Sequence, residues 1–139
     1  MAQLARLAYS TYVPRIGRDP APMKADYADI VNDGHAWVAE EHNRLVGLLV
    51  LRPSAGHMML ENVAVAPSAQ GLGVGARLLR LAEEQAQEQG LPEMRLYTNE
   101  AMTENLTYYR RHGYRETHRS TQDGYSRVFF SKPIAPTNP

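Results

Sequence analysis

Three glycines between an apolar segment and a long amphipathic segment constrain the fold of this chain more than any other feature. Residues 58–66 are rich in apolar side chains typical of a strand, and residues 73–89 place alanine and leucine on one helical face with glutamate outside. Gly71, Gly73 and Gly75 join the two segments. A strand, a helix and a second strand form a crossover, which makes a parallel pair, whereas hairpins make antiparallel pairs.

The apolar pattern predicts further elements on both sides of this unit. They are helices at 2–13, 24–31 and 103–111 and strands at 36–40, 45–51, 94–98, 114–118 and 125–131. This order predicts an α+β domain with a mixed, mostly antiparallel twisted sheet and helices on both faces. We expect residues 1–132 to form one domain and the proline-rich residues 133–139 to form a disordered tail.

Composition narrows the class of protein. A chain of 139 residues is long enough for one domain with a real core. Fifteen basic and fifteen acidic residues cancel, so the charge predicts neither a nucleic acid nor a membrane as partner. The five histidines lack zinc-like spacing, and we expect no metal. The sequence shows neither a secretory signal pattern nor an apolar run of membrane-spanning length, and we expect cytoplasmic residence.

The glycine loop itself predicts an anion-binding site. Glycines let the main chain turn tightly and approach a ligand, so several N–H groups can meet phosphate oxygens at the positive end of a helix dipole. A P-loop is disfavoured, because Ala76 and Arg77, rather than lysine and serine or threonine, follow Gly75. Gly71, Gly73 and Ala76 match the spacing of a dinucleotide fingerprint, but that fingerprint belongs in a doubly wound parallel sheet.

Two segments of the sequence together share the spacing of a known pair of cofactor-binding motifs. The first is Val63-Ala64-Val65-Ala66-Pro67 followed by Gln70-x-x-Gly73-x-Gly75, and the second is Asn105-x-x-x-Tyr109-x-x-x-Gly113-Tyr114. They resemble, in this order, the acyl-CoA signature and the second cofactor segment of the GNAT superfamily of N-acetyltransferases. The resemblance covers about residues 36–132. It implies an acetyltransferase that uses acetyl-CoA.

The resemblance also implies roles for individual residues. Val63 and Val65 would offer main-chain groups to the pantetheine arm, and the glycine loop would hold the pyrophosphate. Asn105 would lie beside the arm, and Tyr109 would stand near the thioester sulfur. The implied cofactor contacts are Val63, Ala64, Val65, Gln70, Gly71, Leu72, Gly73, Val74, Gly75, Ala76, Asn105 and Tyr109.

Acetylation of an amine by a thioester needs a neutral amine and a protonated leaving thiolate. The sequence contains no cysteine, so transfer through a cysteine thioester is excluded, and any acyl transfer is direct or uses another nucleophile. Tyr109 is the candidate general acid, and Tyr108 beside it is expected to pack or to lie at the surface. Glu61 is a candidate base, with a purely structural hydrogen-bond acceptor as the alternative. Strand alternation predicts that its side chain lies on the same side as those of Met59 and Val63.

In the resembled superfamily the acceptor cleft lies between the first two helices and the final hairpin. This implies acceptor contacts at Tyr12, Arg15, Met23, Tyr27 and Tyr125. Members usually begin with a strand ahead of the first helix, and that strand is missing from the predicted order, because too few residues precede the helix at 2–13. An uncovered sheet edge favours pairing, so we expect a possible homodimer.

The leading functional interpretation is an N-acetyltransferase that moves acetyl from acetyl-CoA to a primary amine of a small molecule or peptide. Two alternatives remain open at this point. One is a CoA-binding regulator without turnover. The other is a dinucleotide-binding oxidoreductase built on the formal glycine fingerprint.

Overall fold

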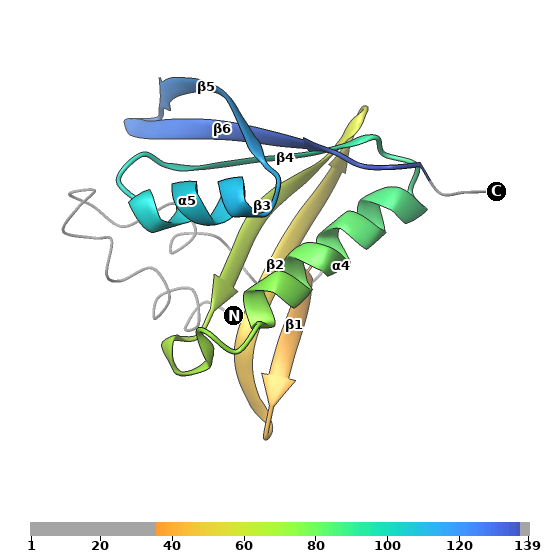
Figure 1. The fold of residues 1–139 in the computed structure, drawn as a ribbon, viewed down its shortest axis with the longest axis vertical. Helices are drawn as coiled ribbons and strands as arrows, with labels where there is room; N and C mark the ends of the chain where they lie inside the picture. Colours follow the sequence, from red (N-terminus) through yellow and green to blue (C-terminus); the bar gives the residue numbers. More distant parts are fainter. Residues whose placement is uncertain (1–35, 137–139) are drawn as a thin grey trace.

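The structure is a computed structural model that describes residues 36–136 (Figure 1). In chain order its elements are β1 (Ala36–Glu41), β2 (Arg44–Ser54), β3 (His57–Val65), a short 3-10 helix η3 (Pro67–Ala69), α4 (Val74–Glu88), β4 (Glu93–Asn99), α5 (Thr103–Arg111), β5 (Arg115–Gln122) and β6 (Tyr125–Pro133). The predicted helices at 2–13 and 24–31, and the question of a strand ahead of them, lie outside the described residues.

The strands form one six-stranded sheet in the order β1-β2-β3-β4-β6-β5. Four of its strand pairs are antiparallel, and β3 with β4 is the parallel pair, because α4 carries the chain across between them. The mixed, mostly antiparallel sheet is therefore confirmed. A doubly wound parallel sheet, which the dinucleotide interpretation requires, is not what the described strands form.

A β-bulge in β3 coincides with the end of its pairing with β4. Val50 pairs with Asn62, whereas the next residue, Leu51, pairs with Leu60, so Glu61 is an extra residue in β3. The parallel ladder with β4 ends at Leu60. Beyond it the two strands diverge, as Figure 1 shows.

Both described helices pack on the same face of the sheet. One apolar cluster joins their buried side chains to those of β2, β3, β4 and β6. The helical members are Leu78, Leu79, Ala82, Ala86, Leu106 and Tyr109. On β2, Leu49 and Leu51 belong to this cluster, whereas Leu48 and Val50 belong to a second one. Because successive strand residues point to opposite faces, the second cluster lies on the opposite face of the sheet.

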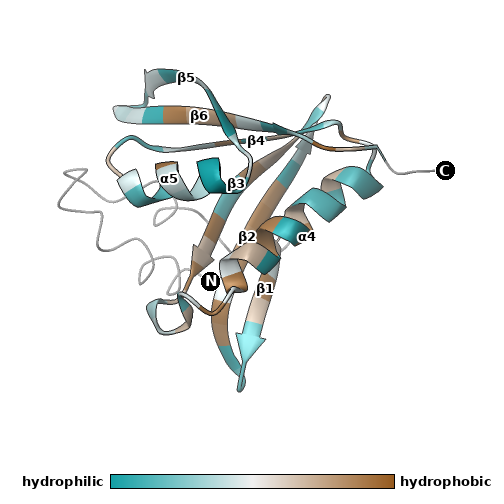
Figure 2. Ribbon diagram, in the orientation of Figure 1, coloured by the Kyte–Doolittle hydropathy of each residue, from teal (hydrophilic) through white to brown (hydrophobic). Residues whose placement is uncertain are grey.

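The C-terminal hairpin is longer than the sequence predicts. β5 extends to Gln122, although its residues are mostly exposed and hydrophilic (Figure 2). β6 continues through Pro133, and the N–H of Ile134 donates a hydrogen bond of 2.8 Å to the carbonyl of Pro92. Backbone pairing thus extends β6 into residues where composition alone predicts a tail, and the domain boundary at residue 132 stays a prediction.

Tyr114 offers a test of this packing, because its hydroxyl is buried without a hydrogen-bond partner. Burial, with the charge of Glu83 nearby, raises the pKa of the Tyr114 hydroxyl. We expect Tyr114→Phe to raise the free energy of unfolding by about 1 kcal/mol, because the ring stays and a desolvated donor is removed. The raised pKa costs the folded wild type further stability above a pH of about 10, so the advantage of the variant grows there.

The measurement is urea unfolding at neutral and alkaline pH. Tyr97→Phe is the matched control, because the Tyr97 ring is only partly buried on β4 and packs against Phe129 at 5.5 Å. A Tyr114→Phe protein less stable than the wild type would contradict the burial of an unsatisfied hydroxyl.

Candidate functional site

A cavity of about 440 Å³ lies where the end of β3, the start of α4 and α5 meet. The residues around it are Val63, Ala64, Val65, Ala69, Gln70, Gly71, Gly73, Val74, Gly75, Ala76, Glu104, Asn105, Tyr108, Tyr109 and His112. It includes all of the cofactor contacts implied by sequence except Leu72, which is 66% exposed. Ala69, Glu104, Tyr108 and His112 line it without having been predicted.

The loop before α4 turns on two glycines in the left-handed region. Gly71 has φ 83°, and Gly73, the residue that caps α4, has φ 84°. L-amino acids pay roughly 1 to 2 kcal/mol for this conformation, so glycine is the residue suited to both positions. The loop therefore brings the chain to the helix start by a tight path, as the sequence predicts.

The main-chain donors at this helix start are available to a ligand. Within residues 36–136, no hydrogen-bond acceptor meets the N–H groups of Gly71, Gly73, Val74, Gly75 and Ala76. The first N–H groups of any helix lack partners inside it, and the helix dipole makes this end positive. Five such donors around one cavity fit a diphosphate.

Gly47 holds this helix start close to the sheet. A Cβ atom at Gly47 would lie 2.9 Å from Val74 Cγ1 and 3.0 Å from Leu78 Cδ1. The first turn of α4 therefore rests directly on the backbone of β2. Sequence analysis did not identify this residue, although a glycine inside an apolar strand indicates a close backbone approach.

α5 contributes the polar side chains on the other side of the cavity. The amide nitrogen of Asn105 lies 3.4 Å from Thr98 Oγ1 and 3.5 Å from Met102 Sδ, which fixes the side chain at the cavity wall. Tyr109 is 6% exposed, and its ring packs edge-to-face with Tyr114 at 5.7 Å between centroids. Tyr108 also reaches the cavity rather than only packing or lying at the surface as predicted.

Gln70 turns back toward β3. Its side-chain nitrogen lies 3.4 Å from the carbonyl oxygen of Val65, a long hydrogen bond. The side chain thus lies at the junction between the end of β3 and the glycine loop. It joins the two parts of the site to which sequence analysis assigned the arm and the pyrophosphate.

Glu61 lies on the opposite face of the sheet from Val63, in contrast to the sequence prediction. Its carboxylate accepts hydrogen bonds from Arg52 at 2.6 Å (Nε) and 3.4 Å (Nη2). Arg52 follows Leu51, which faces the helices, so Arg52 and Glu61 point away from them. The prediction was right for Met59 and wrong for Val63, because the bulge at Glu61 reverses the alternation.

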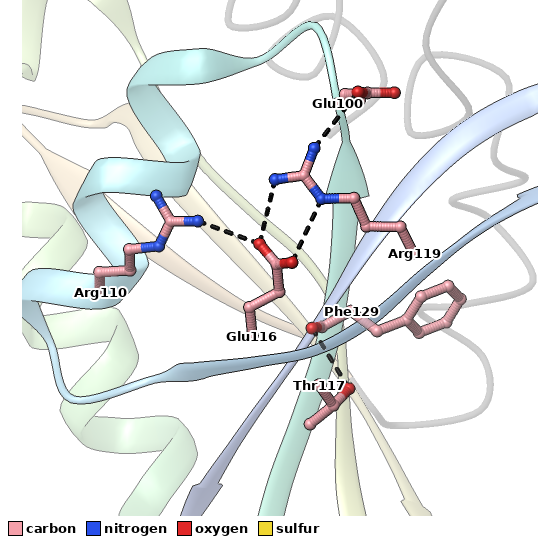
Figure 3. A network of polar contacts seen from close by, with 6 residues as sticks. All are labelled: Glu100, Arg110, Glu116, Thr117, Arg119 and Phe129. Carbon is pink, nitrogen blue, oxygen red and sulfur yellow. Dashed lines mark hydrogen bonds and ion pairs between the residues drawn. The ribbon is translucent and has the colours of Figure 1, made fainter.

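A network of exposed ion pairs ties α5 to its neighbours (Figure 3). Glu116 on β5 accepts from Arg110 of α5 at 3.0 Å and from Arg119 at 3.1 and 3.2 Å, and Arg119 also donates to Glu100 at 3.2 Å. The hydrogen bond from Arg119 is the main cause that lowers the pKa of Glu116. Single exposed pairs stabilise little, but a connected set restricts the helix that carries Tyr109.

The remaining predicted site residues divide in two groups. Tyr125 is buried on β6 and is not among the residues around the cavity. Tyr12, Arg15, Met23 and Tyr27 lie outside the described residues. Over residues 36–136 there is no group of histidine, aspartate and glutamate that could hold a metal ion. Neither of the helices described is long and apolar enough to cross a membrane.

The known proteins to which this chain is similar are acetyltransferases. A family model described as the acetyltransferase (GNAT) family matches residues 1–114. A mycothiol acetyltransferase from Jonesia denitrificans is 37% identical over 82 residues, which cover 58% of this chain and 22% of that protein. The chain thus spans about a fifth of the length of that relative.

Two solved structures show the same fold at low sequence identity. A GNAT-family protein from Desulfovibrio desulfuricans superposes with a TM-score of 0.74 at 20% identity, covering 96% of this chain and 92% of that one. A GNAT acetyltransferase from Elizabethkingia anophelis with acetyl-CoA bound gives a TM-score of 0.63 at 20% identity, covering 81% and 87%. The chain belongs to the GNAT family of acetyltransferases, whose cosubstrate is acetyl-CoA.

Proposed function

We propose that this protein is an N-acetyltransferase that moves acetyl from acetyl-CoA directly to a primary amine of a small molecule or peptide. The observation that carries the proposal is the set of five N–H groups at the start of α4 that have no partner among the described residues, beside a cavity that Tyr109 also lines. A positive helix end suits a diphosphate. The homodimer, the cytoplasmic location and the absence of a nucleic-acid partner remain predictions.

In this proposal the chain holds the cofactor by its backbone more than by its side chains. The N–H groups of Gly71 and of residues 73–76 hold the diphosphate, and the main chain of Val63 to Val65 holds the pantetheine arm. The divergence of β3 from β4 supports the second assignment, because this part of β3 lies beyond the parallel ladder. Asn105 borders the arm from α5. Bound acetyl-CoA supplies the thioester as acetyl donor.

Tyr109 is the proposed general acid. Its side chain lines the cavity while its ring is fixed between Tyr114 and Phe130, at 5.7 and 6.0 Å between centroids. A phenol held in one orientation can donate its proton to a thiolate as the carbon–sulfur bond breaks. In this proposal the amine itself attacks the thioester carbonyl, and no cysteine is present to form a covalent intermediate.

Glu61 is the proposed base, acting through water. It lies at the bulge where the pairing of β3 with β4 ends, on the face opposite to the helices. A base on that face and an acid on the other would act on opposite sides of the reacting carbonyl. Arg52 holds the carboxylate in one orientation by its two hydrogen bonds.

An assay with different amines identifies the acetyl acceptor. The test of the proposal is release of free thiol from acetyl-CoA in a panel of amines and amino-terminal peptides, with mass-spectrometric detection of the acetylated product. Tight CoA binding without turnover for any amine would favour a regulator. Failure to bind CoA would contradict the proposal outright.

Tyr109→Phe should lower kcat by roughly a hundredfold or more and leave KM for acetyl-CoA nearly unchanged, because the variant keeps the ring and loses the proton. The fall of kcat at high pH, where a phenol would be deprotonated, should disappear. Tyr97→Phe is the control, since Tyr97 is a tyrosine on β4 that does not border the cavity. Unchanged activity of Tyr109→Phe across pH would refute the acid role.

Glu61→Gln should lower kcat, because the variant keeps the size of the side chain and loses the proton acceptor. Glu93→Gln is the control, because Glu93 also pairs with an arginine on the same sheet, Arg95 at 3.1 Å, away from the cavity. Both variants break one ion pair, so a difference between them reports the chemistry and not the lost pair. Equal kcat values in the two variants would leave Glu61 a structural residue.

Gly73→Ala and Gly90→Ala form a matched pair that tests whether the N–H groups at the start of α4 bind the diphosphate. Both glycines have positive φ, at 84° and 68°, and no other atom of residues 36–136 lies within 4 Å of an added Cβ at either site. Each variant should lose about 1 kcal/mol of unfolding free energy from backbone strain. Only Gly73→Ala should also weaken CoA binding, by roughly tenfold, because it disturbs donors to a charged group. Equal calorimetric affinities for CoA in the two variants would contradict binding of the diphosphate by these N–H groups.

A further inference from the structure

Tyr108 spans the distance from α5 to the start of α4. Its hydroxyl oxygen lies 2.8 Å from the point that a Cβ atom on Gly75 would occupy. Real Cβ atoms do not tolerate so close a contact with a fixed group, so a side chain at position 75 would displace the Tyr108 hydroxyl. The hydroxyl therefore lies directly against the first turn of α4.

This contact explains why position 75 is a glycine, which the backbone conformation there does not explain. Gly75 lies inside α4, where glycine costs about 1 kcal/mol relative to alanine. Unlike Gly71 and Gly73, it does not have positive φ. The residue is therefore required for space and not for conformation, and the group that uses the space is the Tyr108 hydroxyl.

The ring of Tyr108 is held in place by its neighbours. It meets Tyr109 edge-to-face, with 5.8 Å between centroids and 79° between planes, and it lies 4.4 Å from the ring of His112. Two aromatic contacts on one short helix restrict the side chain to one direction. That direction takes the hydroxyl across the cavity to α4.

The hydroxyl is a donor without an acceptor. Throughout the part of the chain that the structure describes, the Tyr108 hydroxyl makes no hydrogen bond, although the side chain is half-buried at the cavity. Burial raises the pKa of Tyr108, so the hydroxyl stays protonated at neutral pH. A protonated phenol beside unpaired N–H groups adds one more donor to the same place.

We propose that the Tyr108 hydroxyl donates a hydrogen bond to the diphosphate of the cofactor, beside the N–H of Gly75. This inference rests on the proposed function, and it assigns to Tyr108 a role in cofactor binding rather than in catalysis. The sixth donor is a side chain from α5, so α4 and α5 both hold the same anionic group. Gly75 and Tyr108 then act as a pair, in which the glycine makes room for the hydroxyl.

Calorimetry with three ligands tests the proposal. The ligands are CoA, ADP, which carries a diphosphate without the arm, and pantetheine, which carries the arm without a diphosphate. Tyr108→Phe should weaken the binding of CoA and of ADP by roughly tenfold, the loss expected for one hydrogen bond to a charged group. The affinity for pantetheine should not change. Tyr97→Phe should bind all three ligands as the wild type does.

A double-mutant cycle with Gly75→Ala adds a second readout. Gly75→Ala alone should weaken CoA binding, because the added methyl group displaces the hydroxyl. In the Tyr108→Phe protein the same change should weaken it much less, because the hydroxyl is already absent. Additive losses would show that the two residues act independently and would overturn the pairing.

The proposal is overturned if Tyr108→Phe binds CoA as tightly as the wild type. It is also overturned if the affinity for pantetheine falls as much as the affinity for ADP. A lower kcat with unchanged CoA affinity would also overturn it in favour of a role in the chemistry. These failures differ from failure of the proposed function. If the wild type binds CoA, and Gly73→Ala weakens this binding while Tyr108→Phe does not, only this inference fails. If the wild type does not bind CoA, the inference and the proposed function both fail.

Discussion

The site depends on where the parallel pairing of β3 with β4 stops. The ladder ends at Leu60, one residue before the extra residue Glu61. The bulge reverses the alternation, so Leu60 and Val63 both face the helices while Glu61 faces away. One inserted residue therefore brings apolar side chains to the cavity and sends the carboxylate to the opposite face.

The second constraint is the close packing of α4 on β2. Gly47 admits the side chains of Val74 and Leu78 to within about 3 Å of the point that a Cβ atom would occupy, so the start of the helix packs directly on the backbone of β2. The position of the unpaired N–H groups follows from that contact. A helix dipole can hold an anion only where the surrounding structure fixes the helix start, and here β2 does so.

α5 completes the site from the far side and is tied down in two ways. Leu106 and Tyr109 bury its inner side in the main cluster, and Arg110 joins the exposed network around Glu116. The two adjacent tyrosines therefore have different neighbours. Tyr109 packs into the core against Tyr114 and Phe130, whereas Tyr108 crosses to the start of α4. The difference between them is one of helical direction, since consecutive residues on a helix point about 100° apart.

Much of the fold and of the candidate site could be predicted from local patterns. The strand, glycine loop and helix from 58 to 89, the crossover and the hairpin of β1 with β2 follow from periodicity and turn residues, which act over a few positions. The length of β5 and the ordered chain at Ile134 could not be predicted, because hydrophilic or proline-rich segments are ordered there by backbone pairing with distant strands.

The sequence by itself determined the order of elements, the glycines that permit the tight loop and the family resemblance, because these depend on residue type and spacing along the chain. Only the tertiary structure decided the face on which Glu61 lies, the contact of Gly47 with α4 and the reach of Tyr108 to Gly75. Each of these joins residues from different elements. Their distances are set by a bulge and by close packing, which no local pattern of residues encodes.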